Sequence, residues 1–254
     1  MTNCGPNRSA WVTGAGKGIG RALARRLSED GWLVHASART ITDLESLSAE
    51  CPEGSIIPHV LDITDETGTR EVLRAIEKHS GVPNLAVLNA GTHIPNVASE
   101  LKIKPFRDLM ETNYMGTVSS LVLVQEMMRK QGQGHIAVVA SLAGYRGLPA
   151  ASAYGASKAA LINMCEALTP ELAMMGIKLQ LVNPGFVETP LTDKNDFKMP
   201  FLIPVDTAVN HIVDGLSGNS FEITFPWKLA ILMRFLRMLP NPVFFAITKR
   251  MVRL

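Results

Sequence analysis

"SAWVTGAGKGIGRALARRLSEDG", residues 9–31, passes from a short apolar run through a glycine-rich loop into an amphipathic helical pattern. The run over 9–12 is typical of a buried strand. Gly14, Gly18 and Gly20 lie in the loop, where glycine permits a tight turn and brings backbone N–H groups close to a phosphate. The spacing is not a literal GxGxxG, and a glycine turn without a ligand is the alternative. Strand, glycine loop and helix in this order favour the first unit of a nucleotide-binding sheet.

Six further apolar runs follow, each the length of one strand: 32–38, 55–61, 84–89, 135–141, 177–183 and 221–225. Helical patterns, such as the one over 64–81, separate most of them. Strands that alternate with helices are parallel, because each crossover returns the chain to the same end of the sheet. We therefore predict an α/β fold, a Rossmann-like doubly wound parallel sheet of about seven strands with helices on both faces. Ligands of such sheets bind beyond the carboxyl ends of the strands.

Composition and charge divide the chain into a body and a tail. The 254 residues are 46% hydrophobic with a mean hydropathy of +0.14, enough to bury a large core, and no linker interrupts them. We expect one domain over 1–226, extended by a helical tail over 227–254. The tail has six basic residues and no acidic one, whereas the body has 19 basic and 23 acidic residues. A net charge of −4 on the body gives no reason to expect a nucleic acid partner.

Cysteine and histidine usage excludes two classes of protein. The three cysteines, Cys4, Cys51 and Cys165, are odd in number and far apart, which argues against a disulfide framework and a zinc site. The six histidines are scattered, so no metal site is expected. The N-terminus has no apolar signal region. Reduced thiols and the lack of a signal predict a cytoplasmic protein.

The end of the second strand bears on the choice of nucleotide. NAD sites usually place an acidic residue there for the ribose hydroxyls, but this chain reads Ser37, Ala38, Arg39. The planar fork of donors on Arg39 fits a 2′-phosphate, and Lys17 in the glycine loop offers a second positive charge. Either cation alone is typical of a solvated surface. Together, and without the acid, they favour NADP(H) over NAD.

Two later strands also end in polar residues. Asp62 follows the third strand, where a carboxylate can accept a hydrogen bond from an adenine amino group, and Asn89 follows the fourth. Asn89 and the small residues to Gly91 allow a dinucleotide to pass close to the backbone. Taken singly, Asp62 is typical of a turn and Asn89 of a strand-end cap, so both assignments depend on their neighbours.

Tyr154 and Lys158 lie four residues apart among Ala, Gly and Ser, after a strand that ends in Ser141. On a helix the two side chains lie one turn apart on the same face. An ammonium about 6 Å from a phenol, at an effective dielectric constant of about 20, favours the phenolate by ~2.8 kcal/mol, around 2 pKa units. Ser141 then holds a substrate oxygen beside the phenol. The alternative is a packed tyrosine with a solvated lysine. We expect Pro170 to kink or restart this helix.

Six features in this order resemble the short-chain dehydrogenase/reductase family: "TGAGKGIG" (13–20), "NAG" (89–91), Asn113, Ser141, "YGASK" (154–158) and "NPGFVET" (183–189). The resemblance covers roughly residues 8 to 225. It implies that Tyr154 is the general acid/base and that Lys158 binds the nicotinamide ribose and lowers the tyrosine pKa. It also implies that Ser141 orients the substrate and that Asn113 supports a water and proton relay to the lysine. The cofactor contacts that it implies include the Val187 backbone, Thr189, Ile19, Ile63, Ala90, Pro184 and Gly185.

The resemblance implies an NADP(H)-dependent oxidoreductase that transfers hydride between the nicotinamide and a carbonyl or secondary alcohol. Two alternatives stay open: a catalytically silent NADP(H)-binding sensor or scaffold, and an epimerase or dehydratase on the same fold. Members of the family are commonly dimers or tetramers, so a homodimer or homotetramer is expected. We expect 190–204 to form a lid, whose Phe197, Met199, Phe201, Leu202 and Ile203 favour a hydrophobic substrate.

The tail reads as two helices separated by "LPNP" (239–242), and Arg, Lys and Pro interrupt it too often for a membrane span. Packing against the body or a second subunit is one interpretation. The others are a cover over the substrate site and peripheral contact with an anionic membrane.

Overall fold

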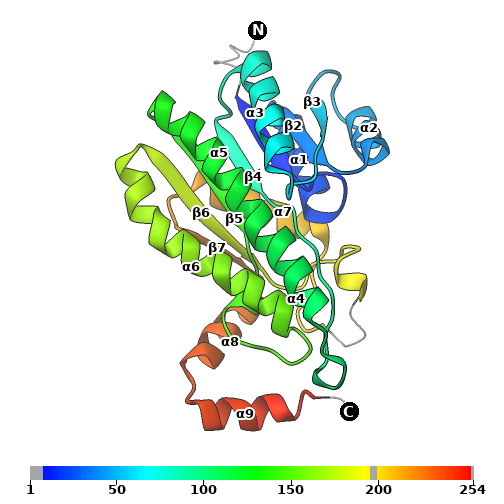
Figure 1. Ribbon diagram of the computed structural model, residues 1–254, viewed down its shortest axis with the longest axis vertical. Coiled ribbons are helices and arrows are strands. Elements are labelled where there is room, and N and C mark those ends of the chain that lie inside the picture. The colour runs from blue at the N-terminus through cyan, green and yellow to red at the C-terminus, as the bar shows by residue number, and fades with distance from the viewer. Residues whose placement is uncertain (1–7, 195–198, 253–254) are drawn as a thin grey trace.

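The computed structural model describes residues 8–194 and 199–252 (Figure 1). Seven strands form one parallel sheet in the order β3-β2-β1-β4-β5-β6-β7. Their bounds are β1 Ser9–Thr13, β2 Leu33–Ala38, β3 Ile56–Val60, β4 Leu85–Leu88, β5 Gly134–Val139, β6 Ile177–Pro184 and β7 Glu222–Phe225. Each strand ends within one or two residues of a predicted apolar run. The predicted doubly wound sheet is confirmed.

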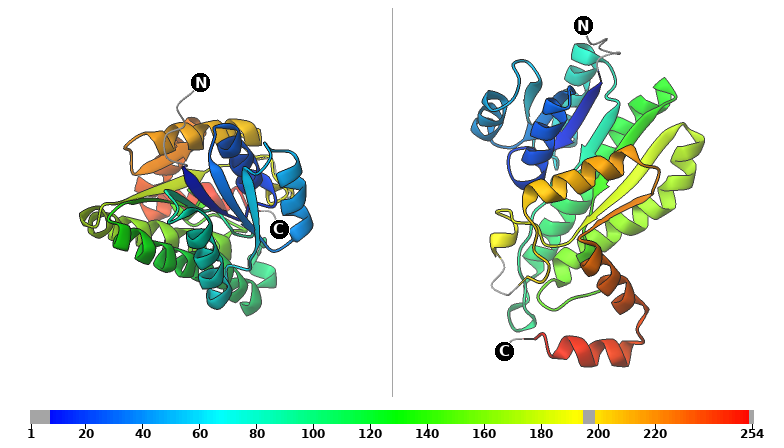
Figure 2. Two further views of the ribbon diagram at one scale, coloured as in Figure 1. Left: turned by 90° about the horizontal axis from the view of Figure 1, so that it is seen from above. Right: turned by 180° about the vertical axis from the view of Figure 1, so that it is seen from behind.

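Helices cover both faces of this sheet (Figure 2). One face packs against α3, α5 and α6, and the other against α1, α2 and α7. The helices are α1 Gly18–Glu29, α2 Ile41–Ala49, α3 Glu66–Ser80, α4 Ile103–Leu109, α5 Gly116–Gln131, α6 Ser152–Met174, α7 Val205–Ser217, α8 Trp227–Met238 and α9 Asn241–Lys249. Each strand therefore divides its side chains between two cores. In β1, Trp11 faces the first core, whereas Ala10 and Val12 face the second.

The strand order reverses between β1 and β4, which creates a crevice beyond the carboxyl ends of these two strands. The glycine loop follows β1 and Asn89 follows β4, so the topology brings two of the predicted motifs together. The loops after β5 and β6 border the same edge of the sheet (Figure 1).

Two helices depart from the simplest sequence interpretation. Helix α6 does not restart at Pro170, as one form of the expectation had it, because it continues through this residue to Met174. Pro170 lies in the last turns, where its missing N–H removes a single backbone hydrogen bond. Between α4 and α5 the chain forms a wide π-helical turn, Met110–Met115, which contains Asn113. Such turns insert an extra residue into a helix and reorient the side chains that follow.

The tail forms the two predicted helices, α8 and α9. Leu229, Ala230, Met233 and Leu236 of α8 and Phe244 of α9 are buried in the first core. The inner faces of both helices therefore pack against the body. Within 8–194 and 199–252, no helix is both long and apolar enough to cross a bilayer.

Candidate active site

The glycine loop requires glycine at positions 14 and 18 for backbone reasons. Gly14 has a φ of +67°, and a Cβ there would lie 2.7 Å from the Ala90 Cα. Gly18 has a φ of +55°, and a Cβ would approach Thr189 within 3.2 Å. Helix α1 begins at Gly18 with no side-chain cap and no acidic residue in its first turn. Its first N–H groups thus point, without a side-chain acceptor, toward the crevice edge where an anion is favoured.

Asn89 joins the ends of β1 and β4. Its Nδ2 donates to the carbonyl oxygens of Thr13 at 3.1 Å and Gly14 at 3.3 Å, and its N–H donates to the Thr13 hydroxyl at 3.0 Å. Gly91 lies beside Lys158, because a Cβ on Gly91 would lie 3.5 Å from the Lys158 Nζ. The side chain of Asn89 therefore supports the glycine loop, and the small residues after it keep the crevice open.

The predicted 2′-phosphate residues lie at the exposed end of the crevice. Arg39 is exposed after β2, and the Lys17 Nζ lies 3.5 Å from the Asp43 Oδ2. The sequence interpretation missed Asp43, which lies on the first turn of α2 and reduces the positive charge of Lys17. Asp62 accepts hydrogen bonds from the N–H and hydroxyl of Thr64 at 3.0 and 2.8 Å. Burial favours a higher pKa for Asp62, but these hydrogen bonds and the charge of Arg39 lower it below its usual value.

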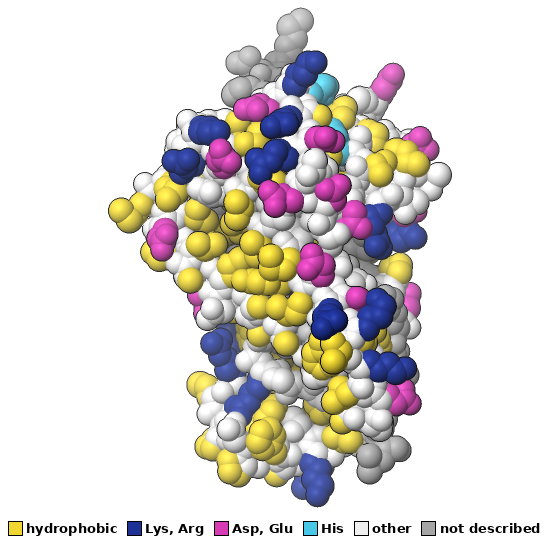
Figure 3. Space-filling model, in the orientation of Figure 1, with side chains coloured by type: hydrophobic (Ala, Val, Ile, Leu, Met, Phe, Trp, Pro, Cys, Tyr) yellow, Lys and Arg dark blue, Asp and Glu magenta, His cyan; other side chains and the backbone are white. Residues whose placement is uncertain are grey.

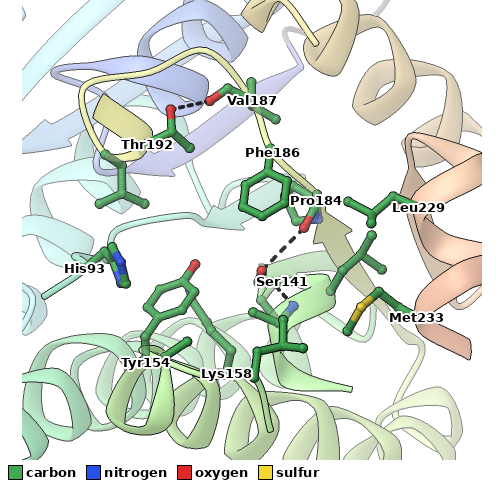
Figure 4. A pocket seen from close by; sticks show the side chains of 18 of the residues that line it. His93, Ser141, Tyr154, Lys158, Pro184, Phe186, Val187, Thr192, Leu229 and Met233 are labelled. Carbon is green, nitrogen blue, oxygen red and sulfur yellow. Dashed lines mark hydrogen bonds between the residues drawn. The ribbon is translucent and has the colours of Figure 1, made fainter. Parts of the chain in front are cut away.

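Tyr154 and Lys158 lie on one face of α6, one turn apart (Figure 4). The Lys158 Nζ lies 5.8 Å from the centre of the Tyr154 ring and donates a hydrogen bond to the Val139 carbonyl at 2.9 Å. Both side chains line the same cavity, as the spacing predicted.

Burial controls the acidity of this pair. It raises the pKa of Tyr154 to about 12, against the lowering effect of a hydrogen bond with Ser141, and it lowers the pKa of Lys158 to about 8. Burial therefore outweighs the predicted lowering of the tyrosine pKa among the protein groups. The cost of transferring a phenolate from water into an apolar cavity opposes the favourable charge of Lys158, whose ammonium donates to Val139.

Ser141 and Asn113 make hydrogen bonds near this pair. The Ser141 Oγ accepts from the Ala143 N–H at 3.1 Å and lies 3.4 Å from the Pro184 carbonyl. Asn113 is fully buried, and its side chain pairs with both backbone groups of Thr92, at 2.7 and 3.0 Å.

Asn113 also donates to the Ser157 hydroxyl at 3.0 Å, and Ser157 donates to the Tyr154 carbonyl at 2.8 Å. The π-helical turn thus directs Asn113 to fix α6 relative to the loop after β4.

The loop after β6 forms a compact turn over the crevice. The Thr192 Oγ1 donates to the Val187 carbonyl at 2.6 Å and accepts from the Thr189 N–H at 3.0 Å. Val187 is buried and Thr189 contacts the Gly18 position, so this loop closes on the glycine loop. Ile63, another predicted cofactor residue, has its side chain buried in the first core.

A cavity of about 600 Å³ connects these groups (Figure 4). Pro184, Gly185 and Ile19 line it together with Ser141 and Tyr154. The rest of the wall includes residues that the sequence interpretation missed: His93, Leu148, Leu229, Leu232, Met233, Leu236, Ile247 and Met251.

Among these residues, His93 contacts Tyr154 edge to face, with ring centres 4.8 Å apart. The sequence indicated a role for His93 at the site in one way, because the residue lies four positions after Asn89 and close to the end of a strand. The residues from α8 and α9 were not predicted individually, although a cover over the substrate site was one interpretation of the tail.

The predicted lid, 190–204, contributes residues to the cavity wall that differ from the apolar residues expected to face a substrate. Leu191, Thr192 and Pro200 line the cavity, whereas Ile203 packs on the second core and pairs with Val187. Phe201 and Leu202 are exposed and do not line it. Phe197 lies outside the described residues, as do Cys4 and Arg253.

Comparison with known proteins identifies the family. Residues 8–199 match the family model of the short chain dehydrogenases. The chain is 37% identical over 246 residues to an uncharacterized oxidoreductase of Myxococcus xanthus, covering 96% of this chain and 97% of the relative. It is 32% identical over 214 residues to the 3-oxoacyl-(acyl-carrier-protein) reductase of Thermotoga maritima, covering 84% and 85%. The fold matches a short-chain dehydrogenase from Streptomyces avermitilis with a TM-score of 0.81, 24% identity and coverage of 98% and 99%.

The chain therefore belongs to the short-chain dehydrogenase family and is an oxidoreductase of that family. The resemblance inferred from the motifs is confirmed.

Proposed function

We propose that this protein is an NADP(H)-dependent oxidoreductase that transfers hydride to or from a hydrophobic carbonyl compound or secondary alcohol. One observation carries the proposal: the Tyr154 side chain, with Ser141 and Lys158 beside it, lines an apolar cavity at the carboxyl edge of the sheet. The name of the Thermotoga maritima relative, a reductase, supports the same class of reaction.

The crevice fits a dinucleotide. The glycine cradle at Gly14 and Gly18 leaves no room for a Cβ, the first turn of α1 lacks a side-chain cap, and Gly91 keeps the approach to Lys158 open. In this proposal the glycine loop and Thr189 hold the pyrophosphate. Asn89 to Gly91, Pro184, Gly185 and Val187 border the nicotinamide. A bound nicotinamide supplies or accepts the hydride.

The residues at the adenosine end of the crevice favour NADP(H) over NAD. Arg39 is exposed at the end of β2, where its planar donors are free to meet a 2′-phosphate from solvent. Lys17 adds charge from the glycine loop, although Asp43 competes for it at 3.5 Å. Asp62 retains a lowered pKa beside Arg39, so it stays ionised and able to accept a bond from an adenine amino group.

The acid–base step follows from the acidity of the pair on α6. With a pKa of about 12, Tyr154 is protonated at neutral pH and donates its proton to a carbonyl oxygen that becomes an alkoxide. The Ser141 hydroxyl donates a second hydrogen bond to the same oxygen. With a pKa of about 8, Lys158 is still mainly protonated at neutral pH, so its charge stabilises the phenolate that remains. Asn113 is a positioning residue, because it reaches Tyr154 only through Ser157.

We expect this enzyme to act in the cytoplasm as a homodimer or homotetramer, and to contact a membrane through 227–254. Light scattering of the purified chain tests the oligomeric state.

The test follows consumption of NADPH with aldehydes and ketones of increasing apolar length. Tyr154→Phe should lower kcat by about a hundredfold to ten-thousandfold, the usual contribution of general acid–base catalysis, while NADPH still binds. Tyr114→Phe is the matched control, because Tyr114 packs against the core away from the cavity. Normal turnover by the Tyr154 variant would remove that residue from the chemistry. Binding of NADPH without turnover of any carbonyl by the wild type would favour a sensor.

A further inference from the structure

The outward sides of α8 and α9 expose apolar residues that the core does not use. We define the outer tail face as Trp227, Ile231, Phe235 and Met238 of α8 together with Val243 and Phe245 of α9. Their exposed fractions are 65%, 57%, 52%, 75%, 48% and 59%. Surface helices of soluble proteins usually carry polar residues on the side away from the core, so this distribution needs a partner.

The two sides of α8 are both apolar, and the helix cannot turn to hide the outer one. Leu229, Met233 and Leu236 already occupy the inner side in the core. Trp227, Ile231 and Phe235 recur every four residues and therefore form one stripe along the opposite side.

Two polar clamps hold this orientation. Arg146, from the loop after β5, donates to three carbonyls at the end of α8 at 2.6–3.0 Å. Arg234 forms an ion pair with Glu222 at 2.8 Å. The exposed stripe is therefore a property of the folded protein and not of a loose tail.

Charge selects the kind of partner. Residues 227–254 contain no acidic residue, and Glu222 neutralises only Arg234. Lys228, Lys249 and Arg250 remain as exposed cations on the same two helices or directly after them. The lower end of the molecule in Figure 3, where Figure 1 places α9, shows Lys and Arg interspersed with hydrophobic side chains. Aromatic and aliphatic side chains bordered by cations match the interface of a bilayer that contains anionic lipids.

A second copy of the chain fits this face less well. A two-fold contact would bring the same face of each copy together, so Lys228, Lys249 and Arg250 would meet a surface of the same sign. The tail offers no carboxylate to compensate them.

The cavity reaches the same end of the protein. Leu232, Ile247 and Met251 line it, yet they are 41%, 39% and 51% exposed, so the cavity wall continues into the outer surface of α8 and α9. The segment that leads into α4 lies at this end in Figures 1 and 2, and it exposes Leu101 and Ile103 by 57% and 69%. Exposed apolar residues therefore lie at the same end of the protein as this part of the cavity wall.

We propose that the outer tail face docks on an anionic membrane surface and that the cavity opens onto it, so that a lipid carbonyl or alcohol enters from the bilayer. The docking stands on the surface alone, whereas the lipid substrate rests on the proposed function. This proposal explains why α8 is apolar on two sides, because the inner side lines the cavity and the outer side contacts the membrane.

The test measures sedimentation of the full chain with vesicles of phosphatidylcholine, alone or with phosphatidylglycerol. Binding should require the anionic lipid and weaken with salt. Ile231→Ser/Phe235→Ser/Phe245→Ser removes apolar contacts without touching the cavity lining, and should weaken binding at least tenfold. Lys228→Glu/Lys249→Glu should weaken it to a similar extent, because each basic residue near an anionic surface contributes about fivefold.

The matched control is Val60→Ser/Val122→Ser/Met174→Ser, since these residues are 55%, 52% and 90% exposed on other elements. The control should bind vesicles as the wild type does. With an apolar ketone dissolved in vesicles, the tail variants should lose activity, but with a small water-soluble ketone they should match the wild type.

Three results would overturn the proposal. The first is no binding to anionic vesicles, and the second is equal loss of binding in the control variant. The third is a change of the tail variants from oligomer to monomer, which would assign the face to a second copy. Vesicle binding without turnover of any carbonyl would refute the proposed function but leave the docking intact.

Discussion

Replacing Arg146 with Met should release α8 and α9 from the body while leaving Tyr154 in place. The Arg146 Nη1 donates to the carbonyls of Leu236, Arg237 and Leu239, its Nη2 donates to Asn241, and its guanidinium lies 4.0 Å from the centre of the Phe244 ring. These carbonyls belong to the end of α8 and to the connection that follows, where no intrahelical donor remains. Met keeps an apolar stem over Phe244 but has no donor.

The magnitude follows from these contacts. Two of the four hydrogen bonds are partly buried and contribute about 1 kcal/mol each, and the two exposed ones contribute about half as much. The cation–π contact adds about 1 kcal/mol, for a total near 4 kcal/mol. Local opening of the tail should therefore become about 700-fold more frequent, since 1.4 kcal/mol corresponds to a factor of ten.

Hydrogen exchange measured by mass spectrometry on peptides from 227–252 tests this prediction. Exchange of tail amides should accelerate, whereas peptides from β1 and α1 should exchange as in the wild type. Arg146→Lys retains one charged donor group, so its tail amides should exchange at a rate between those of Arg146→Met and the wild type. Tail protection within threefold of the wild type would show that the inner apolar faces hold α8 and α9 without the clamp.

Two further predictions concern nucleotide choice and acid stability. Arg39→Asp should shift the ratio of kcat/KM for NADPH and NADH toward NADH by about 10- to 100-fold, and Asp43→Asn should shift it a few-fold toward NADPH by releasing Lys17; unchanged ratios would remove both from the site. His35 is fully buried, and burial and two neighbouring histidines lower its pKa to about 3. Below about pH 6.5 the histidine takes up a proton in the unfolded chain but not in the folded protein. The free energy of unfolding therefore decreases as the pH is lowered. Between pH 7 and 5 this costs about 2 kcal/mol, and urea unfolding of His35→Gln should lose that dependence.

Much of the fold could be predicted from the sequence because the strands are apolar without interruption. A strand covered on both faces needs no polar alternation, so a run such as 135–141 shows both the element and its burial. The pairing of Tyr154 with Lys158 was equally accessible, since the helical period alone puts the two residues on one face.

Long-range contacts account for what could not be predicted. The orientation of the tail depends on Arg146, which lies about ninety residues before the carbonyls that it binds. The pKa of Tyr154 depends on how many segments exclude water from it, and pairwise spacing omits that cost. Asp43 reaches Lys17 only because α2 folds back beside the glycine loop.

Tyr154 and Lys158 come from the middle of the chain, while much of the cavity wall around them comes from its end. Helix α6 carries Tyr154 and Lys158, and α8 and α9 supply Leu229, Met233 and Ile247. If the proposed function holds, substitutions in the last two helices should change substrate preference and leave the Tyr154–Lys158 pair in place. A large part of the cavity wall thus lies within one short, contiguous stretch of the gene, where its shape can change independently of α6.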